Sequence, residues 1–236
     1  MIHRSEPSIL SRWKRWGVSF HVPPSPQPCS VEQLLVDTAE ELHTNARLFA
    51  LAVTWLTQNY PIVDVERLSQ RAVRLHGDAS ARLGLLLETA EGWIRAGVFQ
   101  QAVEVCHPAE TPKPLFAAEA FPPLAELVRK QASEISLRWG LWARPMDRLK
   151  VESLRPASWI AQHNQTYRLR WLFRGDVRSR VVTALMEEQL PAPSEADLTR
   201  FAGCTRKAMH SALDNLESAG LITRKRQGRR YVISVA

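Results

Sequence analysis

Residues 194–235 read SEADLTRFAGCTRKAMHSALDNLESAGLITRKRQGRRYVISV. The apolar spacing in this stretch predicts a short helix after Ser194 and a second helix over residues 205–219. Ser194 and Thr205 are of the residue types that cap helix N-termini, and Gly203 stands where a glycine commonly ends a helix. The predicted order is therefore helix, turn, helix, and the residues that follow predict a two-stranded hairpin.

The second of these helices, residues 205–219, has an apolar face and a polar face. Helical spacing turns one set of residues toward a core: Met209, Ala212, Leu213 and Leu216. The opposite face is polar: Arg206, Lys207, His210, Ser211 and Asp214. A helix held by its apolar side, with polar side chains along the other, has the form that readout of the DNA major groove requires. Asp214 would repel a nearby phosphate, so it either accepts from a cytosine amino group or lies outside the contact.

The hairpin is expected over residues 222–234, with a turn at residues 225–228 where Gly228 permits a positive φ. It carries five basic residues, Arg224, Lys225, Arg226, Arg229 and Arg230. Like charges this close repel one another, so a polyanion that neutralises them is a natural partner. We expect nucleic-acid contacts here, the alternative being a charge run that is only solvated.

The positive charge of the chain is concentrated toward its C-terminus. The 236 residues carry a formal net charge of +7 at pH 7. From Arg168 onward, 13 Lys and Arg face 7 Asp and Glu, a net charge of +6, and residues 1–30 add +3. Residues 31–167 are therefore slightly acidic. This distribution favours a polyanion-binding module attached to a body with a different role.

Two motifs, Ala202–Arg206 (AGCTR) and Leu216–Ile222 (LESAGLI), resemble the winged helix-turn-helix of bacterial transcriptional regulators. The resemblance implies a DNA-binding domain over residues 166–236. Helix 205–219 would lie in the major groove, and the wing, residues 222–234, on the adjacent backbone or minor groove. The residues expected at DNA are Ser194, Thr205, Arg206, Lys207, His210, Ser211, Arg224, Lys225, Arg226, Arg229 and Arg230.

The rest of the chain predicts an arm and a helical body. Residues 1–29 form a basic, proline-rich arm, and residues 30–165 form the body. Apolar residues recur every seven positions at Leu35, Leu42, Phe49 and Leu56. They predict one helix from Ser30 to just before Asn59, either at the centre of a bundle or at a dimer interface.

Further helices are expected over residues 64–75, 78–96, 122–140 and 176–188. Residues 98–106 suit a helix or a strand, and so do residues 166–173, for which we favour the helix. Strand-like alternation is nearly absent before residue 165. We therefore expect a mainly α fold, with a helical N-terminal body followed by a C-terminal winged helix-turn-helix and its small β-hairpin wing.

No motif of a catalytic, cofactor or metal site stands out. The sequence has no glycine-rich phosphate loop and no HExxH, its seven histidines are scattered, and its three cysteines form no CxxC pair. No apolar run approaches the roughly 18 residues that span a bilayer. The expectation is a cytoplasmic protein without membrane association, enzyme activity, cofactor or metal.

The function predicted from these features is sequence-specific binding of double-stranded DNA by a transcriptional regulator, with repression as the expected outcome. The helical body would form a homodimer and is where a small-molecule or protein effector would bind. Its tryptophans line an effector pocket or fill the core. The alternative is a winged-helix interaction module that docks an acidic partner in a larger assembly.

Overall fold

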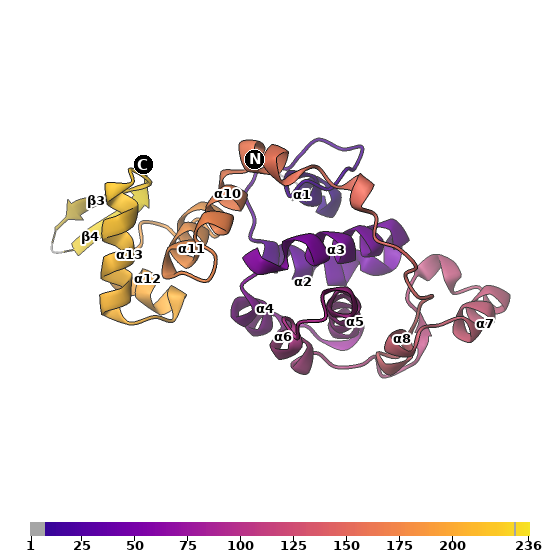
Figure 1. Cartoon of the computed structure of the whole chain (residues 1–236). Helices are drawn as coiled ribbons and strands as arrows, with labels where there is room; N and C mark the ends of the chain where they lie inside the picture. Colours follow the sequence, from indigo (N-terminus) through magenta and orange to yellow (C-terminus); the bar gives the residue numbers. More distant parts are fainter. Residues whose placement is uncertain (1–7, 229) are drawn as a thin grey trace, which may run out of the picture. The chain divides into compact units, whose positions relative to one another are not determined.

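The computed structural model describes residues 8–228 and 230–236, and the chain divides into two compact units. The N-terminal unit consists of Val31–Pro156 with the residues up to Ser25, and the C-terminal unit of Pro26–Ser30 with Ala157–Ala236. Helices dominate both units (Figure 1), so the mainly α fold class is confirmed. Among the described residues, no helix is long and apolar enough to cross a membrane.

The N-terminal unit is a helical body. Its longer helices are α2 (Val31–Glu41), α3 (Ala46–Asn59) and α5 (Gly77–Ile94), and α5 packs against both of the others. The other helical segments are α1 (Ile9–Arg15), η1 (Leu42–Thr44), η2 (Tyr60–Ile62), α4 (Val65–Ala72), α6 (Gln100–Glu104), η3 (Ala117–Glu119), α7 (Pro122–Lys130), α8 (Glu134–Arg138) and η4 (Val151–Ser153). Strands β1 (Lys113–Pro114) and β2 (Leu141–Trp142) form a short parallel pair.

The N-terminal residues that the structure describes pack onto this body. Trp13 and Trp16 are completely buried, and each meets the buried Trp55 ring edge-on with 5.6 Å between ring centroids. The Trp13 indole N–H donates to Thr38 Oγ1 at 2.8 Å, and the Trp55 indole N–H donates to the Trp16 carbonyl at 2.8 Å. These three tryptophans are therefore core residues.

The prediction of one continuous helix from Ser30 to Asn59 is wrong, because the chain leaves the helix at Asn45. The Asn45 backbone is extended (φ −148°, ψ 97°), and its side chain accepts from the Leu48 N–H at 3.2 Å, which caps α3. Such local side-chain bonds compete with helix continuation. The seven-residue stripe is nonetheless buried in both halves, at Leu35, Leu42, Phe49 and Leu56, which favours the bundle interpretation.

Two other predicted helices end earlier than expected. Helix α5 stops at Ile94 because Arg95 adopts the left-handed conformation (φ 58°) before Gly97 is reached. The segment over residues 122–140 is two helices, α7 and α8, because the Ser133 backbone is extended and its hydroxyl accepts from the Ser136 N–H at 3.2 Å. In the ambiguous stretch of residues 98–106, the chain forms the helix α6.

The C-terminal unit consists of five α-helices and a hairpin within its described residues. The helices are α9 (Ala157–His163), α10 (Gln165–Leu172), α11 (Val177–Val182), α12 (Glu195–Ala202) and α13 (Arg206–Ser218). Helix α11 continues into a π-helical turn, Thr183–Glu187, in which the Glu188 N–H donates to the Thr183 carbonyl at 3.0 Å. The predicted helices over residues 166–173 and 176–188 are thereby confirmed.

The π-helical turn supplies one half of a buried ion pair. The Arg170 guanidinium of α10 donates to both carboxylate oxygens of Glu187, at 3.1 and 2.6 Å. Their side chains are 2% and 0% exposed. Burying two charges is tolerable only when they satisfy each other in this way, so the pair fixes α10 against the end of the α11 segment.

Strands β3 (Ile222–Gln227) and β4 (Arg230–Val235) form the antiparallel hairpin, with Gln227 opposite Arg230. The predicted turn over residues 225–228 is therefore too long, since pairing continues through Lys225 and Arg226. Gly228 has φ 64°, as a tight hairpin turn requires. Helices and hairpin share one core, which includes Val181, Leu198, Met209, Leu213, Leu216, Ile222 and Ile233.

Candidate nucleic-acid interface

Helices α12 and α13 begin at the two residues that the sequence identifies as caps. The Asp197 N–H donates to Ser194 Oγ at 3.3 Å and the Ser194 N–H donates to Asp197 Oδ2 at 3.0 Å, which completes a capping box. Thr205 Oγ1 accepts from the Ala208 N–H at 3.2 Å. Gly203 lies between them with φ 59°, a left-handed conformation that glycine adopts without strain. Both predicted capping residues therefore fix helix ends.

Helix α13 is held by its apolar face, as the sequence predicts. Met209 and Leu213 are completely buried and Leu216 is 1% exposed. The outward side chains of the first two turns are exposed: Arg206, Lys207, His210 and Ser211. Within the described residues, the Arg206 and Lys207 side chains form no hydrogen bond or ion pair, so the N-terminal turn of α13 presents two uncompensated cations.

Arg224 differs from the other predicted contact residues, because the protein itself neutralises it. Its guanidinium donates to Asp214 Oδ1 at 2.6 Å and to Glu217 Oε2 at 2.8 Å, and its side chain is 21% exposed. The hydrogen bond from Arg224 holds the pKa of the Glu217 carboxyl below its ordinary value. Arg224 thus joins β3 to α13, and it also supplies Asp214 with a partner.

His210 lies between two carboxylates on the exposed side of the helices. Its Nδ1 is 3.6 Å from Glu195 Oε2 on α12, and its Nε2 is 3.4 Å from Asp214 Oδ2 one turn along α13. The imidazole remains 61% exposed.

The hairpin presents further cations. Lys225 and Arg226 are exposed in β3, and as consecutive strand residues they point to opposite faces. Arg226 Nε donates to the Gly228 carbonyl at 3.3 Å. Of the other two predicted contact residues, Arg229 lies outside the described residues, and Arg230 is placed by its backbone pairing with Gln227.

Sequence reasoning missed the acidic partners in this region. Asp214 and Glu217 are one helical turn apart, so they share a face of α13, and Arg224 is the first basic residue after Gly220 ends that helix. That spacing was a usable signal for an internal ion-pair cluster. Arg180 was also passed over: its guanidinium donates to the Ala202 carbonyl at 2.6 Å and so binds the C-terminal end of α12.

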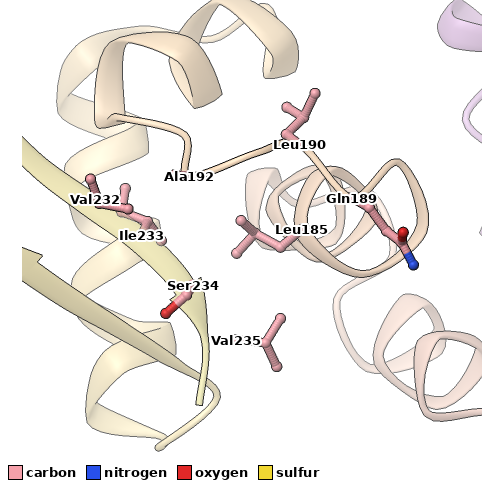
Figure 2. A pocket seen from close by; sticks show the side chains of 8 residues that line it. All are labelled: Leu185, Gln189, Leu190, Ala192, Val232, Ile233, Ser234 and Val235. Atoms are coloured by element: carbon pink, nitrogen blue, oxygen red, sulfur yellow. The ribbon is translucent and has the colours of Figure 1, made fainter.

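A cavity of about 360 Å³ adjoins the hairpin on its β4 side. Figure 2 shows it between β4 and the connection that precedes α12, with Leu185, Leu190, Val232, Ile233 and Val235 around it. In that connection Gln189 and Ala192 have φ values of 49° and 46°, and the Ile233 N–H donates to the Pro193 carbonyl at 3.0 Å. Its lining is mostly apolar and includes no charged residue, so it does not belong to an anion-binding surface.

No model of a known protein family matches the chain, and neither a curated protein nor a solved structure shows significant similarity to it.

Proposed function

We propose that the C-terminal unit is a winged helix-turn-helix that binds double-stranded DNA. Helix α13 would enter the major groove with its N-terminal turn, and the hairpin would contact the adjacent backbone or minor groove. The observation that supports this most is the contrast among cations. Arg206, Lys207 and Lys225 are exposed and without internal partners in the described chain, whereas Arg224 is neutralised by two carboxylates.

In this proposal the side chains have different tasks. Arg206 and Lys207 occupy the turn of a recognition helix that meets base edges and phosphates, and His210 and Ser211 lie one turn further. Lys225 and Arg226, with Arg230 and Arg229 beyond them in sequence, would neutralise phosphates without reading bases. Thr205 and Ser194 would hold helix N-termini, where backbone N–H groups favour phosphate oxygens.

Arg224 has a positioning task in this proposal. Because it is paired with Asp214 and Glu217, it offers DNA little net charge, but it fixes the hairpin relative to α13. A wing and a recognition helix can contact one duplex together only when their relative position is set.

At the level of the whole chain, we propose a cytoplasmic transcriptional regulator that acts as a repressor. The N-terminal unit would form a homodimer, which presents two copies of α13 to two half-sites. The same unit would receive a small-molecule or protein effector.

The test is selection of bound duplexes from random DNA, followed by mobility-shift titrations over a range of salt concentrations. Log affinity falls as log salt rises, and each lost phosphate contact reduces the magnitude of this negative slope by about 0.9. Lys207→Gln and Arg226→Gln should each lower it, whereas Arg74→Gln, an exposed cation of the N-terminal unit, should leave it unchanged. Failure to bind any duplex at low salt would reject the proposal.

A second candidate is a winged-helix module that docks an acidic protein partner. The apolar cavity beside the hairpin favours it, because DNA backbone contacts have no use for an uncharged pocket, whereas protein interfaces combine apolar pockets with a polar rim. Leu185→Asp would distinguish the two: it should abolish protein docking at the cavity while duplex binding, if present, keeps its salt slope.

A further inference from the structure

The N-terminal unit contains a cavity of about 290 Å³ that plays no part in the proposed DNA contacts. One wall is a single face of α5, since Leu85, Thr89, Gly92 and Trp93 have the i, i+4, i+7, i+8 spacing of one helical stripe. Trp93 is 40% exposed. A large aromatic ring open to solvent beside a cavity offers a flat apolar surface to a ligand.

The other walls come from separate elements and are also largely apolar. Phe49 projects from α3, Ile135 from α8, and Pro145 and Met146 from the segment after β2. Phe116 packs edge-on against the Phe49 ring, with 6.3 Å between centroids. The volume is near the lower limit of the roughly 300–1,000 Å³ of ligand pockets, which suits a molecule about the size of a bicyclic aromatic.

Two arginines give this apolar cavity a single sign of charge. Arg95 and Arg144 are the only charged residues among the twelve that line it, and both are exposed. Within the described residues, neither guanidinium forms a hydrogen bond or an ion pair. Arg144 does act on the nearby Glu119 carboxyl, whose pKa is raised by burial against the opposing effect of that guanidinium. A planar guanidinium fork matches a carboxylate with two parallel hydrogen bonds.

Two backbone features of α5, at Gly92 and Arg95, lie beside this cavity. A side chain at Gly92 would meet nothing within 4 Å, so packing does not require a glycine there. Arg95 is left-handed (φ 58°, ψ 37°), a conformation that helix ends usually assign to glycine. Strain at the edge of a cavity is typical of positions that serve a function.

We propose that this cavity binds a small organic anion, with its flat apolar body against Trp93 and its carboxylate at Arg95 and Arg144. The arginines select the charge, and the space above Gly92 admits the apolar body. The proposal goes beyond DNA binding and does not depend on it.

The first test is ligand-observed NMR titration of the full-length chain with 2-naphthoate and with its neutral isostere 2-naphthamide. We expect 2-naphthoate to bind with a dissociation constant at or below about 1 mM, as a fragment of this size allows, and the amide to bind at least tenfold more weakly. Equal affinity for the two, or no binding of 2-naphthoate, would overturn the proposal.

Two variants locate the site without loosening the fold. Gly92→Leu fills the open space, and Arg95→Gly removes one guanidinium from a position where glycine fits the backbone, so both should melt at or above the parental temperature. Each should weaken 2-naphthoate binding at least tenfold, whereas Arg74→Gln should not change it. Binding that survives both variants places the ligand elsewhere and refutes the assignment. Should Gly92→Leu melt early, Arg95→Gly alone decides.

Discussion

Gly84 and Gly92, which lie beyond the first turn of α5, should respond in opposite directions to alanine. A Cβ at Gly84 would lie 2.2 Å from Trp139 Cη2, so the ring has to move. Trp139 is 6% exposed and its indole N–H donates to Glu88 Oε2 at 2.6 Å. At Gly92 a Cβ would meet nothing within 4 Å. The same substitution on the same helix thus compares the cost of a steric clash at Gly84 with the gain in helix propensity at Gly92.

The magnitudes follow from three terms. Alanine stabilises a helix interior by about 1 kcal/mol relative to glycine. Overpacking costs about 1–3 kcal/mol, and losing a hydrogen bond to a charged group costs about 1.5–3 kcal/mol. Gly84→Ala should therefore lower the free energy of unfolding by about 1.5–5 kcal/mol, and Gly92→Ala should raise it by about 0.5–1 kcal/mol.

The assay is urea and thermal unfolding of the full chain, where 1 kcal/mol corresponds to about 2–4 °C for a domain of 150–250 residues. Trp139→Leu provides the internal control, because Gly84→Ala should cost at least about 1 kcal/mol less once the large ring is absent. If Gly84→Ala raises the melting temperature as Gly92→Ala does, the close approach of Trp139 to α5 is refuted.

Three further outcomes are expected. Arg170→Met removes the guanidinium that neutralises the buried Glu187 carboxylate and should cost about 3–5 kcal/mol, most of which the double variant Arg170→Met/Glu187→Met recovers in urea unfolding; equal loss in both variants would show that the charge pairing is immaterial. Burial raises the pKa of the Cys106 thiol to about 11 from an ordinary value of 9.0, so the unfolded chain ionises first and stability, complete below pH 9, falls between pH 9 and 11 by about 2–3 kcal/mol. Cys106→Ala should remove that fall, and an unchanged profile would assign it to other groups. Arg206→Ala should weaken binding to a selected duplex by about 1–3 kcal/mol and relax one base position, whereas a uniform loss over all sequences would make Arg206 a phosphate contact.

The C-terminal elements were the most predictable from sequence, because their signals are local. Ser194, Thr205 and Gly203 act through bonds within three residues of themselves, and the α13 periodicity needs no distant partner. The prediction of one long helix from Ser30 was wrong because it was based on the apolar stripe and not on a local signal. The apolar stripe indicates which residues are buried, and it runs on both sides of Asn45. The helix is interrupted there because the Asn45 side chain accepts a hydrogen bond from the Leu48 N–H.

The candidate site was predicted as a set of basic and polar residues, and the structure divides the basic ones into paired and unpaired. Whether an arginine is available to a ligand depends on which acids fold against it, and Arg224 meets Asp214 and Glu217 only when β3 returns beside α13. Residue preferences also did not predict that α5 ends at Arg95. They favour an end at Gly97, two positions later, because glycine adopts the left-handed conformation more readily than arginine.

The π-helical turn at Thr183–Glu187 has a consequence for insertions and deletions in this chain. A π turn holds one residue more than an α turn, so it is what remains when a helix absorbs a single inserted residue without unwinding. Removing one residue there would restore an ordinary α-helix of similar length. The chain beyond the turn would keep its place, whereas the residues inside the turn would leave the helix in new directions, which would separate Glu187 from Arg170. Sequences that share this architecture but lack the extra residue should therefore also lack the charged pair, and an apolar residue should stand in place of Arg170.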